Sequence, residues 1–365
     1  MGYDLAVASH DSELARIVEE LNRATSAGAA SERSQQPSAR PVSGSLAELL
    51  AAAARANASD LLLIAGARPA MRVNGALALC EGRDLSAEDV RSLLLSLLTP
   101  AQYEELQKKK SVDFGFLQEG AGRCRANIHY QRGTVAGAIR LLPPRLPSLE
   151  SLNLPQGLAR VTERRQGLVL VTGPAGCGKS STLAAFIDLI NGARRDHIVT
   201  IEDPIEYQHP NRRSVVEQIE VGRDTPDFAG TVRSVLRQSP DVILVGEMRD
   251  PETIATVLTA AETGHLVFST LHTNDTSQTV SRILDSFPAA NQPQIRLQLA
   301  LSLTAIIAQQ LVPALDARTR YPALEIMMGT DAIKNLIRRG QDHQLRSQVA
   351  MGRSQGMFTM EQSLA

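Results

Sequence analysis

The chain has 365 residues, which is enough for roughly two domains. Lysine and arginine together number 38, aspartate and glutamate 39, and aromatic residues make up 3%, so neither a basic surface nor a base-stacking platform for nucleic acid is expected. No apolar run approaches the roughly 18 residues that cross a bilayer, the first residues lack the apolar core of a signal peptide, and the three cysteines lack metal-ligand spacing. We therefore expect a cytoplasmic protein.

Residues 1–45 are expected to form an extension that precedes the folded part. Apolar residues recur at helical spacing up to Leu21 and predict a short helix. Residues 25–45 consist mostly of Ala, Ser, Gln, Arg, Pro and Gly, a composition typical of a flexible linker. We interpret the extension as dispensable.

Residues 46–143 predict a small α+β domain. Helices are expected over Leu46–Ala54 and Leu85–Leu98, the second with Ser86 as its N-cap. Strands are expected at 60–64, 71–73, 112–117 and within 123–142, where apolar and polar residues alternate. Several prolines then mark an interdomain linker over residues 144–153.

Arginines gather on two neighbouring strands of this domain: Arg123, Arg125, Arg132 and Arg140. Arg123 and Arg125 fall on one strand face because side chains alternate along a strand. Two interpretations stay open: an ordinary solvated sheet face, or cations that reach the triphosphate of a neighbouring subunit.

The strongest motif in the sequence is Gly167–Ser181, an apolar strand that leads into a complete phosphate-binding loop pattern. The glycines allow backbone N–H groups to cradle phosphates, Lys179 can reach the β and γ phosphates, and the Ser180 hydroxyl can bind Mg²⁺. The following helix directs its positive end at the same phosphates. We therefore expect binding of ATP and Mg²⁺ by Gly173, Pro174, Ala175, Gly176, Cys177, Gly178, Lys179, Ser180 and Ser181.

Strands and helices alternate after this loop. Strands are predicted at 198–201, 242–245 and 266–268, and helices at 228–238 and 251–263, with Asp250 capping the last. Ligands of open α/β sheets bind at the carboxyl ends of the strands. The residues that follow these strand ends are polar, and they are Glu202, Asp203, Glu206, Glu247 and His272.

Roles for these side chains follow from their positions. Glu247 ends an apolar strand, so we assign it to hold Mg²⁺ through water. We assign Glu206 as the general base. The reverse assignment of the two carboxylates stays open. Asp203 is either a turn cap or a direct participant. His265 and His272 are either core histidines or, because we expect both beside the same sheet edge, sensors of the nucleotide state.

The last part of the chain predicts three further elements. Leu297–Gln309 is expected to be a mostly apolar helix, and Leu324–Met328 a strand. Thr330 is expected to cap a helix over Ala332–Arg339, which buries its apolar side and exposes Lys334 and Arg338. That helix is either a packing element or a coupling element that meets an acidic surface of a partner.

Together, these segments resemble a known family. Residues 201–207 look like its aspartate box, 244–250 like its Walker B motif, and 261–265 with 270–273 like its histidine box. The family is the type II/IV secretion ATPase superfamily. Within it, residues 332–338 resemble the signature of the PilT-like retraction ATPases of type IV pili.

The resemblance covers residues 46–365 and implies an α/β fold: a RecA-like P-loop ATPase domain over 154–365, with a C-terminal helical part, and a smaller PAS-like α+β domain. It implies a homohexamer that hydrolyses ATP to drive pilus retraction at the cytoplasmic face of the inner membrane. The implied partners are a pilus platform protein in that membrane and a paralogous retraction ATPase. By the same resemblance, Arg123, Arg125 and Arg140 match the arginines that help to bind or stabilise phosphates.

Four other functions remain as alternatives. The nearest alternative is an accessory, PilU-like retraction ATPase. An assembly or type II secretion ATPase fits less well, because the tetracysteine zinc motif and an additional N-terminal domain are not found. Outside the motors, the candidates are a regulatory nucleotide-binding module and a small-molecule P-loop kinase.

Overall fold

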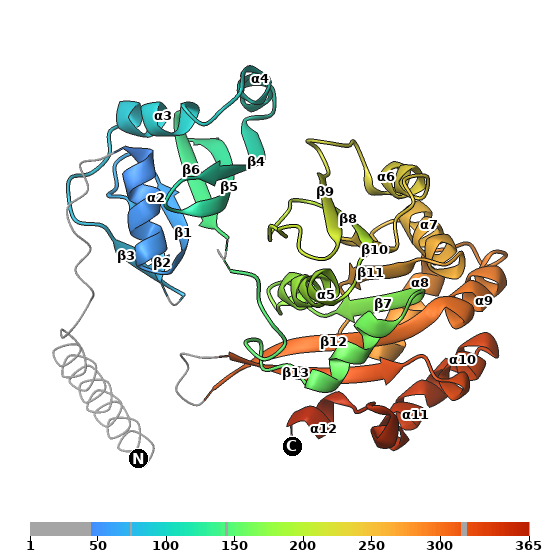
Figure 1. Cartoon of the computed structure of the whole chain (residues 1–365). Helices are drawn as coiled ribbons and strands as arrows, with labels where there is room; N and C mark the ends of the chain where they lie inside the picture. Colours follow the sequence, from blue (N-terminus) through green and yellow to red (C-terminus); the bar gives the residue numbers. More distant parts are fainter. Residues whose placement is uncertain (1–44, 74, 143–144, 315–319, 365) are drawn as a thin grey trace, which may run out of the picture.

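The computed structural model describes residues 45–73, 75–142, 145–314 and 320–364, which fold around two β-sheets (Figure 1). We call residues 46–142 the N-terminal domain and residues 145–364 the C-terminal domain. The helix and linker predicted for residues 1–45 lie outside the described residues except for Ser45, which caps the first described helix through a capping box with Glu48.

The N-terminal domain is an antiparallel sheet covered by helices. Its strands pair in the order β3-β2-β1-β6-β5-β4. They are β1 (Ala58–Leu63), β2 (Ala70–Val73), β3 (Ala76–Leu79), β4 (Ser111–Gln118), β5 (Gly122–Gln131) and β6 (Thr134–Leu141). The helices α2 (Leu46–Arg55), α3 (Ala87–Leu95) and α4 (Pro100–Lys109) contribute leucines to one buried core with this sheet.

The predicted elements of this domain are confirmed, but two were missed. Ser86 caps α3 as expected. Helix α4 carries its own signal, because Thr99 is its N-cap and Pro100 its first residue. Strand β3 lacks a comparable signal, since its four residues are all exposed at the sheet edge.

The C-terminal domain is built on a mixed seven-stranded sheet in the order β13-β12-β7-β11-β10-β8-β9. Its strands are β7 (Gly167–Thr172), β8 (His197–Glu202), β9 (Val215–Glu220), β10 (Val242–Val245), β11 (Leu266–Leu271), β12 (Leu303–Pro313) and β13 (Arg320–Met328). Only the β12–β13 pair is antiparallel among these described strands. The carboxyl ends of all these strands except β13 therefore meet at one edge of the sheet.

Helices cover both faces of this sheet (Figure 1). They are the 3₁₀ helix η1 (Gln156–Glu163), α5 (Lys179–Ala193), α6 (Phe228–Val235), α7 (Pro251–Glu262), α8 (Thr276–Asp285), α9 (Gln292–Ser302), α10 (Asp331–Arg338), α11 (Leu345–Met351) and α12 (Met360–Leu364), with short 3₁₀ turns at Asp342–Gln344 and Arg353–Gln355. Leu168 and Leu170 of β7 pack toward the core that includes α6 to α11, whereas Val169 and Val171 pack toward α5 and η1. An unbroken apolar strand is what burial on both faces requires.

The predicted helix over Leu297–Gln309 is wrong in its second half. Helix α9 ends at Ser302, and Leu303 begins strand β12, which runs parallel to β7. A short apolar run has no periodicity that separates a buried helix from a buried strand. The strand prevails here because it extends the sheet beyond β7 and pairs with β13 on its other side.

Helix α10 (Asp331–Arg338) begins and ends one residue before the predicted bounds, Ala332 and Arg339, and its charged face differs from the prediction. Thr330 caps it, and Ile333 and Ile337 are fully buried. Arg338 is exposed as expected, whereas Lys334 is half-buried and donates to the carbonyl oxygen of Leu301 at 3.1 Å. Burial lowers the pKa of Lys334. Within the described ranges, no helix is long and apolar enough to cross a bilayer.

Candidate functional site

The phosphate loop connects the carboxyl end of β7 to the start of α5, as the motif predicts. Gly173, Gly176 and Gly178 have φ of 141°, 76° and 91°, which side chains rarely tolerate. A Cβ added at Gly173 would lie 2.1 Å from the carbonyl oxygen of Gln309. The glycine pattern is therefore a steric requirement of this turn.

Lys179 is the cation of the loop. Its Nζ donates to the carbonyl oxygens of Gly173 at 2.7 Å and Pro174 at 3.0 Å, so the ammonium lies across the loop. Burial lowers the pKa of Lys179, and the charges of Cys177, Glu247 and Glu206 oppose that effect. A phosphate in this loop would therefore meet a pre-positioned cation.

Gln309, in β12, forms hydrogen bonds with the phosphate loop and with the helix that follows it. Its Nε2 donates to the carbonyl oxygen of Cys177 at 2.6 Å, and its Oε1 accepts from Thr182 Oγ1 at 2.8 Å. Gln309 and Thr182 are buried, so these bonds form away from water. Sequence reasoning missed this residue, because nothing in the local pattern brings positions 127 residues apart together.

We expect Gln309→Met to lower the free energy of unfolding by about 1–3 kcal/mol, because a side chain of similar size leaves the Cys177 carbonyl and the Thr182 hydroxyl buried without partners. Urea unfolding would measure the change. Gln310→Met, one residue further along β12 and only half-buried, is the matched control. An equal loss in both variants would show that Gln309 does not support the loop.

The predicted carboxylates meet at the same sheet edge as the loop. They surround a cavity of about 350 Å³. Its lining includes Ala175, Gly176, Lys179, Ser180, Glu202, Asp203, Glu206, Tyr207, Glu247, Arg249 and His272, together with Arg125 from the N-terminal domain. The expectation that these residues converge is confirmed for the named side chains.

Glu247 lies just beyond the end of β10. Its carboxylate pairs with Arg249 and lies 3.6 Å from His272 Nε2, and 13% of its side chain is exposed. His272 follows β11 and therefore stands beside Glu247 at the cavity. The arrangement places a partly desolvated carboxylate opposite the phosphate loop.

Glu202, at the end of β8, has an unusual environment. Burial raises the pKa of Glu202 to about 7, although Thr200 and Gln218 donate to its carboxylate at 2.7 Å and 3.2 Å. Near neutral pH this group is therefore balanced between its neutral and charged forms. Sequence reasoning placed Glu202 at the edge without giving it a role.

Glu206 lies in the irregular segment that follows β8, and it lines the cavity with Asp203. The next residue, Tyr207, shares a hydrogen bond of 2.8 Å between its hydroxyl and that of Ser181 in α5. The segment that carries Glu206 is thus tied directly to the helix of the phosphate loop.

His265 does not lie beside His272, contrary to the sequence prediction. It precedes β11 whereas His272 follows it, so the two histidines are at opposite edges of the sheet. The Nδ1 of His265 contacts the carbonyl oxygen of Ala260 at 3.0 Å, and His265 is not among the residues that line the cavity. The expectation of two histidines beside one edge is wrong, because a six-residue strand separates them.

The arginines of the N-terminal domain are placed differently from one another. Arg125 lines the cavity of its own chain, and Arg140, which pairs with Asp60, lines a second hollow of about 670 Å³ between the domains. Arg123 pairs with Glu220 of the same chain. Arg132 lies in the turn between β5 and β6, with φ of 49°, and lines neither hollow.

The donor set at the cavity fits Mg²⁺ bound with a nucleotide. Among the described residues, no three His, Cys, Asp or Glu side chains gather closely enough to hold a metal. Mg²⁺ in nucleotide sites takes one or two protein groups and completes its shell with phosphates and water. The Ser180 hydroxyl and the Glu247 carboxylate, which both line the cavity, are such groups.

A known protein family and several relatives match most of this chain. A family model described as type II/IV secretion system protein matches residues 144–360. The chain is 43% identical over 319 residues to the type IV pilus retraction ATPase PilT of Pseudomonas aeruginosa, covering 87% of this chain and 92% of that protein. It is 39% identical over 306 residues to the type IV pilus ATPase PilU of the same organism, covering 84% and 80%.

A crystal structure of the pilus retraction motor PilT with bound ADP has a TM-score of 0.82 to this chain at 44% identity, covering 88% of this chain and 92% of that one. This likeness confirms the expected fold class, an α/β ATPase domain with a smaller N-terminal domain. The PAS-like description of the N-terminal domain stays a prediction.

Proposed function

The chain belongs to the family of type II/IV secretion system proteins, and on that basis we propose that it is an ATPase motor that retracts type IV pili. One observation carries the proposal: the phosphate loop, Glu206 and Glu247 line a single cavity at the carboxyl edge of the sheet. A nucleotide whose phosphates occupy the loop would expose its γ phosphate to both carboxylates.

The proposed chemistry is hydrolysis of ATP to ADP and phosphate. The loop N–H groups and Lys179 bind the β and γ phosphates, and Mg²⁺, held by Ser180 and, through water, by Glu247, supplies charge neutralisation when bound. Glu206 takes the proton of the attacking water, and His272 senses the phosphate from beside Glu247. We assign no part in this chemistry to His265, because it lies at the opposite sheet edge.

We further propose that the protein works as a homohexamer. Arg125 and Arg140 face hollows that border the phosphate loop, and their guanidinium groups can stabilise phosphate charge in their own or a neighbouring subunit. Helix α10, which packs on the opposite face of the sheet from α5, is the element we propose for contact with a platform protein of the inner membrane. With Lys334 bonded to the carbonyl oxygen of Leu301, Arg338 is its more accessible cation.

We propose either the principal motor or the accessory retraction ATPase, because the chain is similar to both PilT and PilU. Either would work at the cytoplasmic face of the inner membrane, and a paralogous ATPase would be a possible partner. A type II secretion ATPase is a less favoured alternative.

Phosphate release from Mg-ATP by the purified protein, measured without any acceptor, tests the enzymatic part. A motor hydrolyses ATP under these conditions. A kinase would need an acceptor to turn over at a comparable rate, and a regulatory module would bind ATP without releasing phosphate. Either of the last two results would contradict the proposal.

A further inference from the structure

The segment that carries Glu206, residues 203–209, has no regular secondary structure, so side chains rather than a strand ladder hold it in place. Two residues of β9 do so from one side. Gln218 Nε2 donates to the carbonyl oxygen of Tyr207 at 2.9 Å, and its Oε1 accepts from the backbone N–H of His209 at 2.9 Å. Glu220 Oε2 accepts from the backbone N–H of Ile205 at 3.1 Å.

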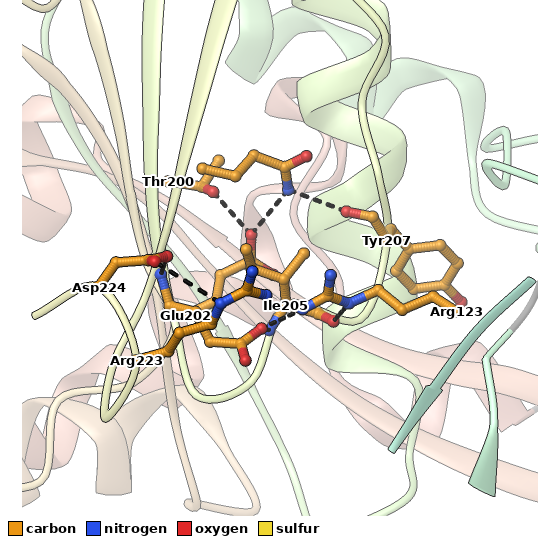
Figure 2. A network of polar contacts seen from close by, with 9 residues as sticks. Arg123, Thr200, Glu202, Ile205, Tyr207, Arg223 and Asp224 are labelled. Atoms are coloured by element: carbon orange, nitrogen blue, oxygen red, sulfur yellow. Dashed lines mark hydrogen bonds and ion pairs between the residues drawn. The ribbon is translucent and has the colours of Figure 1, made fainter. Parts of the chain in front are cut away.

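Arg123 holds the same segment from the N-terminal domain (Figure 2). Its Nε donates to the carbonyl oxygen of Ile205 at 2.9 Å, and its Nη2 pairs with Glu220 Oε2. Only 11% of the Arg123 side chain and 6% of the Glu220 side chain are exposed. The N–H and C=O of Ile205 are therefore both fixed by one buried ion pair, immediately before Glu206.

The strand next to Arg123 leaves room for this pair. Gly115 of β4 faces it, and a Cβ added there would lie 3.2 Å from Arg123 Nη2 and 3.4 Å from Glu220 Oε1. The end of β9 is fixed as well, because the Glu220 backbone N–H donates to Asp224 Oδ2 at 2.9 Å. The pair is thus a well-packed contact between the two domains.

We propose that Arg123 is a positioning residue that acts within its own subunit, linking the placement of the N-terminal domain to the placement of Glu206. The inference rests on the proposed function for the role of Glu206, and it replaces the expectation that Arg123 contacts a phosphate in a neighbouring subunit. Movement of the N-terminal domain would pull on Ile205 through Arg123 and shift the neighbouring carboxylate. A shift of about 1 Å at a catalytic group can cost about 10²-fold in rate.

The test uses the full chain with the double substitution Arg123→Leu/Glu220→Gln, which removes both buried charges together and so avoids leaving one unpaired. Arg91→Ala, on the exposed face of α3, is the control. We expect kcat for ATP hydrolysis to fall about tenfold or more in the double variant while KM changes by no more than about threefold, the pattern of an interaction that matters only in the transition state. A higher KM at unchanged kcat would instead make Arg123 a phosphate ligand and overturn the proposal.

Hydrogen exchange gives a second readout that does not depend on turnover. Amides of residues 203–209 should exchange at least about tenfold faster in the double variant, and those of the phosphate loop at the wild-type rate. Unchanged exchange over 203–209 would overturn the proposal. If the wild-type protein hydrolyses no ATP, the proposed function fails, and exchange still decides whether Arg123 holds this segment.

Mixing subunits separates action within a subunit from action across subunits. Arg123→Leu/Glu220→Gln protein mixed with Lys179→Ala protein should show no more activity than the two proteins measured separately, because each site depends on the Arg123 of its own chain. Recovered activity, in oligomers shown to exchange subunits, would place Arg123 at a neighbour's site and contradict the inference.

Discussion

Lys179→Ala is expected to lower ATP hydrolysis at saturating Mg-ATP by at least about 10²-fold, the loss typical of removing one preorganised donor to developing charge. Lys179 lies across the phosphate loop and contacts the carbonyl oxygens of Gly173 and Pro174, so its ammonium is already where the β and γ phosphates must bind. Steady-state phosphate release measures the effect.

Lys108→Ala is the control for this change, because Lys108 is an exposed lysine of α4 in the N-terminal domain and should leave turnover unchanged. Retention of more than a small fraction of wild-type activity by Lys179→Ala would contradict the assignment of residues 173–181 as the phosphate site.

Glu206→Gln is expected to bind ATP normally and to lose about 10²- to 10⁴-fold in hydrolysis, because the amide keeps the shape of the side chain but cannot accept a proton. A fluorescent ATP analogue would report binding, and phosphate release would report turnover.

Two companion variants make this result specific. Glu217→Gln, at an exposed residue of β9, should behave like wild type. Glu247→Gln should impair the binding of Mg²⁺ at the site. If Glu206→Gln turned over ATP normally and Glu247→Gln were inactive, the roles assigned to the two carboxylates would be reversed.

Much of the fold could be predicted because local sequence and tertiary position agree. Thr330, Asp250 and Ser86 each cap the helix that the sequence assigned to them. The strand before the phosphate loop is apolar throughout because both of its faces are buried. Leu303–Pro313 could not be predicted in this way, since its apolar run fits a buried helix as well as a buried strand.

The candidate site could be predicted where a strand end fixes the position of a side chain, as for Glu202, Glu247 and His272. It could not be predicted where the contact joins distant parts of the chain. Arg123 and Glu220 are 97 residues apart, and Thr182 and Gln309 are 127 apart. Nothing in either segment identifies the other, so only the folded chain shows that these pairs support the site.

The central claim is that this ATPase drives pilus retraction, and the most direct measurement replaces the chromosomal gene of its host with the Glu206→Gln form. Surface motility and surface pili would then be scored together against the wild-type strain. Lost motility with excess pili is expected, because assembly continues while retraction stops. Loss of pili would instead identify an assembly motor, and unchanged motility and pili would contradict the retraction claim altogether.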